Sequence, residues 1–146
     1  MVAGWLSIPV YFGLEAIIRV LNVGKDASMD AAMRAAMVAA HVDVDMDRLR
    51  LVAPATLPIK NPAITLGHTV FARRSMDGSD ISDVHLMAHE LCHVVQRERL
   101  GRVAMAVHYG RGWVEGFSYT DHVMEVEARA YADEALPNLR DHLKTT

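Results

Sequence analysis

The chain has 146 residues and a formal net charge of −3 at pH 7, with 51% hydrophobic and 23% charged residues. This length is enough for a hydrophobic core, so we expect a single domain over residues 1–146. The slightly negative charge argues against a nucleic-acid-binding protein and against binding to an acidic membrane surface. The single cysteine, Cys92, excludes an internal disulfide. A reducing compartment is compatible with this, and we expect a cytoplasmic protein.

Residues 1–23 are largely apolar, but they do not read as a signal peptide. Glu15 and Arg19 interrupt the apolar run, and neither a basic segment nor a small-residue cleavage pattern accompanies it. The run is also shorter than the roughly 20 apolar residues that span a bilayer. Pro9 suits the first turn of a helix that continues to about Asn22. We therefore expect a buried or docked helix, with attachment to a membrane as the less favoured alternative.

The next segment predicts a second helix, which begins at Asp26 or Ser28 and continues to Ala40. Its alanines favour the helix and allow close packing, and its methionines fill gaps in a core. Together with the preceding helix it forms a predicted N-terminal helical region over residues 1–42.

Residues 48–73 predict short β-strands, because apolar and polar residues first alternate there and prolines then break the chain into loops. Residues 64–66 and 69–72 are predicted strands. Gly67-His68 between them suits a two-residue type II′ hairpin turn, which takes glycine at its first position. If the strand over residues 69–73 is exposed at the sheet edge, an extended peptide can pair with it.

A helix over residues 81–100 carries the pattern around which the chain is organised. It is predicted to begin near Asp80 or Ser82, and Leu100-Gly101 is a typical helix end. A ligand-bearing helix needs polar residues on one stripe and an intact apolar face on another. The apolar face here comprises Val84, Met87, Ala88, Leu91 and Val95, and the polar stripe comprises His85, His89, His93 and Gln96.

Residues 89–93 of this helix read H-E-x-x-H. Residues four apart lie on one face of a helix, so His89 and His93 can bind one Zn²⁺ together. Glu90 follows the first histidine directly, beside the position of a metal-bound water. A carboxylate there can take the proton of that water, which makes Glu90 the predicted general base.

Three other residues of this helix are given no direct role. His85 extends the histidine row but is too far along the helix to share an ion with His93, and we interpret it as a residue of the surface or of the surroundings of the site. Gln96 is interpreted as part of the pocket rim. Cys92 lies off the histidine stripe and is interpreted as a small buried apolar residue.

A catalytic zinc site needs three protein ligands and one open position. A later helix over residues 120–136, which must end before Pro137, carries two candidates, Glu125 and Glu127. Each precedes an alanine by three residues, and a small residue lets two helices approach closely. One helix cannot direct both at one ion, because they lie about 200° apart around its axis. Residues 138–146 are predicted to be a frayed tail.

Residues 102–119, between these two helices, have a weaker pattern. Residues 103–107 are compatible with a short helix, and the glycines and aromatic residues from position 110 onward indicate a loop. The oxyanion that forms in peptide hydrolysis needs a hydrogen-bond donor. Tyr109, His108 and Tyr119 are the candidates, and Tyr109 is our choice.

The H-E-x-x-H motif followed by a later E-x-x-A helix resembles the gluzincin type of zinc metallopeptidase. More narrowly, residues 88–96, the preceding Gly67…Val70-Phe71 and the sequence Glu125-Val-Glu-Ala128 resemble the small bacterial DUF4157 domains, also called extracellular contractile-injection-system core domains. The resemblance covers residues 64–135. It implies a zincin-like α+β domain, mainly helical, with a small β-sheet or hairpin before the active-site helix.

In gluzincins the third zinc ligand is the first glutamate of E-x-x-A-D, which corresponds to Glu125. The position after the alanine, acidic in many gluzincins, is Arg129 here. The resemblance therefore implies a zinc metalloendopeptidase that acts on a peptide or protein substrate. The alternative is a non-catalytic, metal-stabilised interaction or scaffold domain. Docking to a membrane through residues 1–23 is a further, separate alternative.

Overall fold

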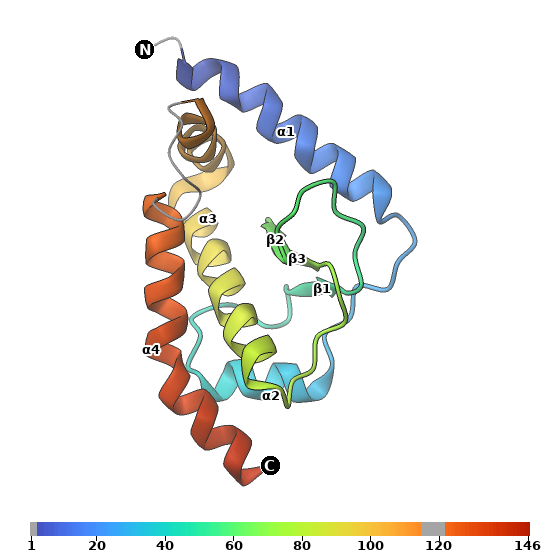
Figure 1. Ribbon diagram of the computed structural model, residues 1–146, viewed down its shortest axis with the longest axis vertical. Coiled ribbons are helices and arrows are strands. Elements are labelled where there is room, and N and C mark those ends of the chain that lie inside the picture. The colour runs from blue at the N-terminus through green and yellow to red at the C-terminus, as the bar shows by residue number, and fades with distance from the viewer. Residues whose placement is uncertain (1–2, 115–121) are drawn as a thin grey trace.

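The computed structural model describes residues 3–114 and 122–146. Within these residues, four helices surround a small three-stranded sheet, which confirms the expected mainly helical α+β fold (Figure 1). The elements in chain order are α1 (Ala3–Leu21), α2 (Ala31–Ala39), β1 (Arg50–Val52), β2 (Ala63–Leu66), β3 (Thr69–Ala72), α3 (Ile81–Val114) and α4 (Val123–Thr145).

The sheet has the strand order β1-β3-β2. β3 pairs in parallel with β1 and antiparallel with β2, so it has neighbours on both sides. The interpretation of β3 as an edge strand for a peptide is therefore wrong, and β2 is an outer strand instead. The hairpin turn is as predicted, because Gly67 has a φ of +69° while His68 does not have a positive φ, a combination that fits type II′ and excludes type I′.

Two hydrophobic clusters form the core, one on each face of the sheet. Val70 belongs to the larger cluster, which joins α2, α4 and the first half of α3. Phe71, the next residue of β3, belongs to the smaller cluster, which includes Tyr11 and Ile18 of α1. Successive strand residues point to opposite faces, so β3 contributes to both clusters. α3 lies between α4 and the sheet (Figure 1) and thereby places the H-E-x-x-H motif near the middle of the molecule.

α3 begins where the sequence predicts. The backbone N–H groups of Ser82 and Asp83 donate to Asp80 Oδ1 over 2.8 and 3.1 Å, so Asp80 caps the helix. Gly101, with φ 79° and ψ 167°, interrupts α3 close to the predicted end. The chain then resumes a helical path to Val114, so the predicted loop from position 110 is wrong for residues 110–114. The buried face of this second half packs against α1, which explains the difference.

The other helix boundaries differ from those predicted where the prediction depended on a proline or on the choice of a capping residue. α1 already begins at Ala3, so Pro9 lies inside it, and α2 begins after Asp30, whose carboxylate accepts the N–H of Met33 over 2.6 Å. α4 continues through Pro137 to Thr145, which contradicts both the predicted end and the frayed tail. A helical proline removes one backbone donor. Burial of Leu139 in the larger cluster favours the helical path in spite of that loss.

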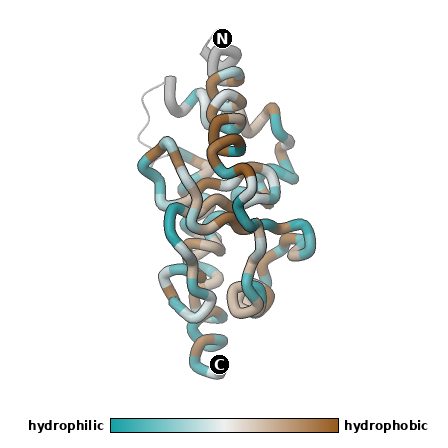
Figure 2. Tube along the Cα trace, turned by 90° about the vertical axis from the view of Figure 1, so that its right-hand side faces the viewer, coloured by the Kyte–Doolittle hydropathy of each residue, from teal (hydrophilic) through white to brown (hydrophobic). Residues whose placement is uncertain are grey.

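None of the helices in the described ranges is sufficiently long and apolar to cross a membrane. Many residues along α1 are hydrophobic, as Figure 2 shows. Some of them, including Ile17 and Val20, are exposed on the outer side of the helix. Docking of residues 1–23 to a membrane surface therefore stays a prediction.

Candidate metal centre

Both histidines of the motif face α4. His89 Nε2 lies 3.2 Å from Glu125 Oε2, and His93 Nε2 lies 3.3 Å from Glu125 Oε1. His93 and Glu125 are buried, and the side chain of His89 is 15% exposed. The helical spacing of four residues thus places the two imidazoles around one carboxylate, as expected.

The beginning of α4 positions Glu125. His122 caps this helix, since its side chain accepts the N–H of Met124, and Glu125 lies in the first turn. A carboxylate in the first turn is stabilised by the N-terminal end of the helix dipole. Ala128, one turn later, is completely buried, as expected for a small residue that lets α4 approach α3.

Glu127 faces a different partner. It forms a bidentate ion pair with Arg99, whose two guanidinium nitrogens lie 3.0 Å from its two carboxylate oxygens. This hydrogen bonding to Arg99 lowers the pKa of Glu127. Of the two glutamates that the sequence left open, Glu125 is the one beside the histidines.

Gln96 connects the two carboxylate environments. Its Oε1 lies 2.7 Å from His93 Nδ1, while its Nε2 donates to Met124 O and to Glu127 Oε2, both over 2.9 Å. Because the amide nitrogen faces two acceptors, the amide oxygen must face His93, and His93 Nδ1–H is the donor. His93 Nε2 then keeps a lone pair. Gln96 is therefore more than part of the pocket rim, and its position three residues after His93 was the available signal.

A zinc ion fits this group of residues. Bonds of about 2.0–2.2 Å in a tetrahedral site place ligand atoms about 3.3–3.6 Å apart, close to the two N···O separations given above. One ligand atom from each of His89, His93 and Glu125 lies within 4.8 Å of the others. In addition, His93 Nε2 is buried without a hydrogen-bond partner. Two histidines and one glutamate are a known ligand set of catalytic zinc.

The site also has an electrostatic preference for a cation. Burial by itself lowers the pKa of His93, but the adjacent Glu125 carboxylate, 3.3 Å from His93 Nε2, and the charge of Glu90 outweigh this effect. The pKa of His93 is therefore raised. A raised histidine pKa indicates that negative charge dominates around the imidazole.

Thr65 of β2 holds the predicted general base. Its Oγ1 lies 2.6 Å from Glu90 Oε2 and 3.1 Å from Glu90 O. Glu90 is 3% exposed, so the hydroxyl fixes a nearly buried carboxylate. Sequence reasoning missed Thr65, because nothing in a short strand indicates which of its residues will contact a glutamate 25 positions later in the chain.

Tyr109 enters the site from the second half of α3. Its hydroxyl donates to Glu125 Oε1 over 3.1 Å and lies 3.1 Å from His93 Nδ1. Its ring stacks between those of Tyr11 and His122. Of the three oxyanion candidates, Tyr109 is in the metal centre, His108 is exposed, and Tyr119 lies outside the described residues.

Three further residues lie around the centre without joining it. His85 pairs with Asp133 on the surface over 2.9 Å, in agreement with its interpretation. Cys92 is buried, and desolvation raises the pKa of its thiol to about 12, so it is no thiolate ligand at neutral pH. Arg129 is exposed, and the partner of His93 is Gln96 instead of an acidic residue at that position.

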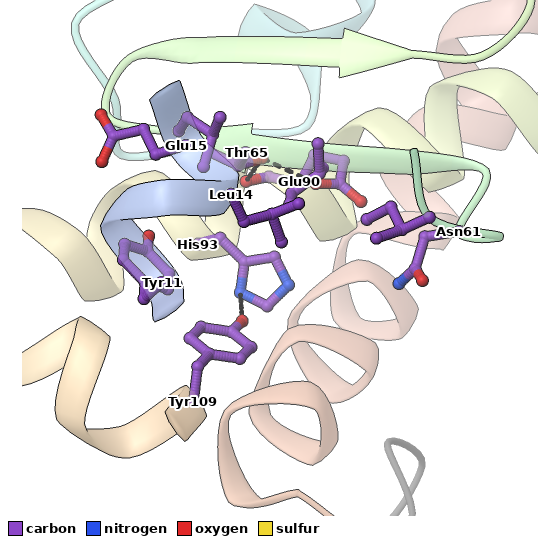
Figure 3. Close-up of a pocket in the computed structure, with 11 residues that line it drawn as sticks. Tyr11, Leu14, Glu15, Asn61, Thr65, Glu90, His93 and Tyr109 are labelled. Carbon is purple, nitrogen blue, oxygen red and sulfur yellow. Dashed lines mark hydrogen bonds between the residues drawn. The ribbon is translucent and has the colours of Figure 1, made fainter. Parts of the chain in front are cut away.

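A cavity of about 330 Å³ opens beside the metal centre. Glu90, His93 and Tyr109 line one side of it, as Figure 3 shows. The opposite walls come mainly from α1 and β2, through Tyr11, Leu14, Glu15, Ile64, Thr65 and Leu66. The predicted catalytic residues and an open space for a ligand therefore occur together.

Comparison with known proteins gives one family. The family model of the eCIS core domain matches residues 24–101, which include the three strands and the H-E-x-x-H motif. α1 and α4, and with them Glu125, lie outside the matched residues. No curated protein and no solved structure matches the chain.

Proposed function

This chain belongs to the eCIS core domain family, and we propose that it is a zinc-dependent endopeptidase of the gluzincin kind. The observation that carries the proposal is that ligand atoms of His89, His93 and Glu125 lie close together. One of them, His93 Nε2, is buried and lacks a hydrogen-bond partner. Glu90 and an open cavity lie next to this group. A purely structural metal site has no use for a carboxylate in the position of Glu90.

The residues divide the reaction between them. When bound, zinc would lower the pKa of a water molecule and polarise the carbonyl of the scissile peptide bond. Glu90 accepts a proton from the water as the water oxygen attacks the carbonyl carbon. It then delivers this proton to the nitrogen of the leaving amine as the C–N bond breaks. Because Thr65 binds Oε2 of Glu90, the other oxygen, Oε1, carries the proton.

Two other groups support the reaction. Tyr109 holds Glu125 and lines the cavity, and we assign its hydroxyl as the donor to a developing oxyanion. β2 takes the role first considered for β3, because it is an outer strand and its Thr65 contacts Glu90. An extended substrate that pairs with β2 would place its backbone beside the general base.

Metal analysis and two substitutions test the proposal. We expect the purified protein to bind about one zinc per chain and the His93→Ala variant to bind much less. We also expect Glu90→Gln to keep the metal and to lose hydrolysis of an unfolded protein substrate. Equal zinc in wild type and His93→Ala would refute the metal centre. Hydrolysis that survives Glu90→Gln would refute the mechanism.

A non-catalytic, metal-stabilised interaction domain is the second candidate. It is favoured by the position of α1, which contributes one wall of a rather small cavity and leaves limited space for a polypeptide. The two candidates differ in measurable ways. A scaffold loses thermal stability when a chelator removes zinc, but neither the wild type nor Glu90→Gln hydrolyses any polypeptide.

A further inference from the structure

The cavity beside Glu90 has mainly apolar walls. Leu14 of α1 and Ile64 of β2 both line it, and Ile59, Leu66 and Tyr11 complete the apolar surface. Figure 3 shows Leu14 directly above the imidazole of His93. An apolar side chain that enters this cavity is transferred from water to an apolar surface, which is favourable. This surface lies directly beside Glu90 and His93.

The charges around the cavity disfavour an acidic ligand, and the described residues that line it include no lysine or arginine. Glu15 is 6% exposed, and its carboxylate accepts hydrogen bonds from Arg19 and Arg102, each over 3.2 Å. In Figure 3 this carboxylate points away from His93 and Glu90. The two guanidinium groups neutralise Glu15, and the remaining carboxylate, Glu90, repels an anion.

α1 is fixed firmly enough to define the shape of the cavity. Arg19 donates to Leu66 O over 3.2 Å, which joins α1 to β2. Asn22 donates to Thr56 O over 2.9 Å and accepts the Thr56 N–H over 2.8 Å. Contacts with both β2 and the loop that precedes it make the wall preorganised, and a preorganised wall loses little entropy when a ligand binds.

We propose that this cavity binds one large aliphatic or aromatic side chain of a peptide, next to the bond positioned at Glu90, and that α1 determines this selectivity. The proposal rests on the proposed function in that the peptide reaches the site as a substrate would. The volume of about 330 Å³ lies near the lower limit for ligand pockets and suits a single side chain. α1, which supplies Leu14 to this wall, lies outside the residues that match the family model.

Peptide binding to the Glu90→Gln protein tests the inference without hydrolysis. The probes are blocked hexapeptides Ala-Ala-Ala-X-Ala-Ala, in which X is Gly, Ala, Leu, Phe or Glu, and calorimetry measures their dissociation constants with and without zinc. We expect the Leu and Phe peptides to bind about 10- to 100-fold more tightly than the Gly peptide. In the zinc-free protein the Glu peptide is expected to bind no better than the Gly peptide, because the mainly apolar walls would desolvate its carboxylate without a charged partner.

Two substitutions in α1 form a matched pair. Leu14→Trp fills the cavity and is expected to weaken binding of the Leu and Phe peptides at least about tenfold. Ile17→Trp places the same side chain on the exposed outer side of α1 and should leave the dissociation constants of all the peptides unchanged. Leu14→Ala, which enlarges the space, should shift the preference from Leu towards Phe.

Equal affinity across the series, or no binding by any member, would overturn the inference. So would equal effects of Leu14→Trp and Ile17→Trp. These outcomes are separate from a failure of the proposed function. If the protein binds the Leu and Phe peptides selectively but holds no zinc, or hydrolyses no polypeptide, the inference of an apolar binding site is supported. The proposed peptidase function is then refuted.

Discussion

The Nδ1 atom of His93 lies 2.7 Å from the side-chain oxygen of Gln96, one turn later on the same helix. The contact is completely buried, and Gln96 is held from its other side by Met124 O and Glu127. Residues that orient a ligand histidine in this way fix which ring nitrogen faces the metal. Gln96 is therefore expected to contribute to zinc affinity without touching zinc.

Replacing Gln96 should weaken metal binding specifically. We expect Gln96→Leu to lower zinc affinity by about 10- to 100-fold, because His93 loses the acceptor for its Nδ1–H. Competition with a chromophoric chelator measures the affinity. The control is Asp133→Asn, which removes a surface partner of His85 on the same pair of helices. Unchanged zinc affinity in Gln96→Leu, with normal thermal unfolding of the metal-free protein, would contradict the role of Gln96.

The two neighbouring glutamates of α4 should respond differently to the same substitution. Glu125→Gln is expected to lose most of the bound zinc, because the charged ligand between the histidines disappears. Glu127→Gln should retain it, since Glu127 faces Arg99 and Gln96. Zinc content after gel filtration distinguishes the two variants. Loss of zinc from Glu127→Gln alone would mean that the ligand assignment is reversed.

Thr65 should affect the rate and leave the metal in place. Thr65→Val removes the hydroxyl that holds Glu90 but keeps the shape of the side chain. We expect kcat to fall by about tenfold or more with little change in KM and zinc content, as for a group that positions the general base. Thr65→Ser restores the hydroxyl and should restore most of the rate. A rise in KM at unchanged kcat would indicate a role in substrate binding instead.

Asp83 links the stability of α3 to pH. Its side chain is 3% exposed and accepts hydrogen bonds from Arg74 and from the N–H of Asp77. Burial alone raises the pKa of Asp83, but these bonds outweigh it and the pKa is lowered. A carboxylate whose folded pKa lies below the unfolded value of about 3.9 stabilises the protein above that pH. This contribution is lost as the pH falls through the folded pKa.

We therefore expect Asp83→Asn to reduce the free energy of unfolding at pH 7 by about 1–3 kcal/mol, the range for hydrogen bonds to a buried charged group. The difference from wild type should shrink as the pH falls and the wild-type carboxylate becomes protonated. Urea unfolding at neutral and acidic pH measures both values. The control is Asp141→Asn, which alters an exposed pair with Lys144. A difference that is independent of pH would rule out the charged form as the source.

Gly78 permits the loop before α3 to contact α2. A side chain at this position would overlap the backbone of Ala32 and Met33, which cannot move as a flexible side chain can. Gly78→Ala should therefore lower the free energy of unfolding by about 1–3 kcal/mol. Gly13→Ala is the matched control, because nothing lies within 4 Å of its added methyl group and alanine favours the helix. An unfolding temperature that is lowered equally in both variants would contradict this explanation.

The features that the sequence predicted correctly depend on residues close together in the chain. The period of a helix places His89, Glu90 and His93 on adjoining faces whatever packs against them. The cap at Asp80 and the turn at Gly67 likewise follow from local backbone preferences. For this reason the predicted start of α3, the hairpin and the histidine pair agree with the structure.

The remaining features were decided by packing between elements that are distant in sequence. The helix period shows that Glu125 and Glu127 face different ways, but only the approach of α4 to α3 decides that Glu125 meets the histidines. Burial of Leu139 likewise determines that the helix passes through Pro137. The sequence by itself thus determined the histidine pair of the candidate metal centre and the adjacent Glu90. Tertiary packing alone selected the third carboxylate and the α1 wall, because a local pattern fixes the face of an element but not its neighbour.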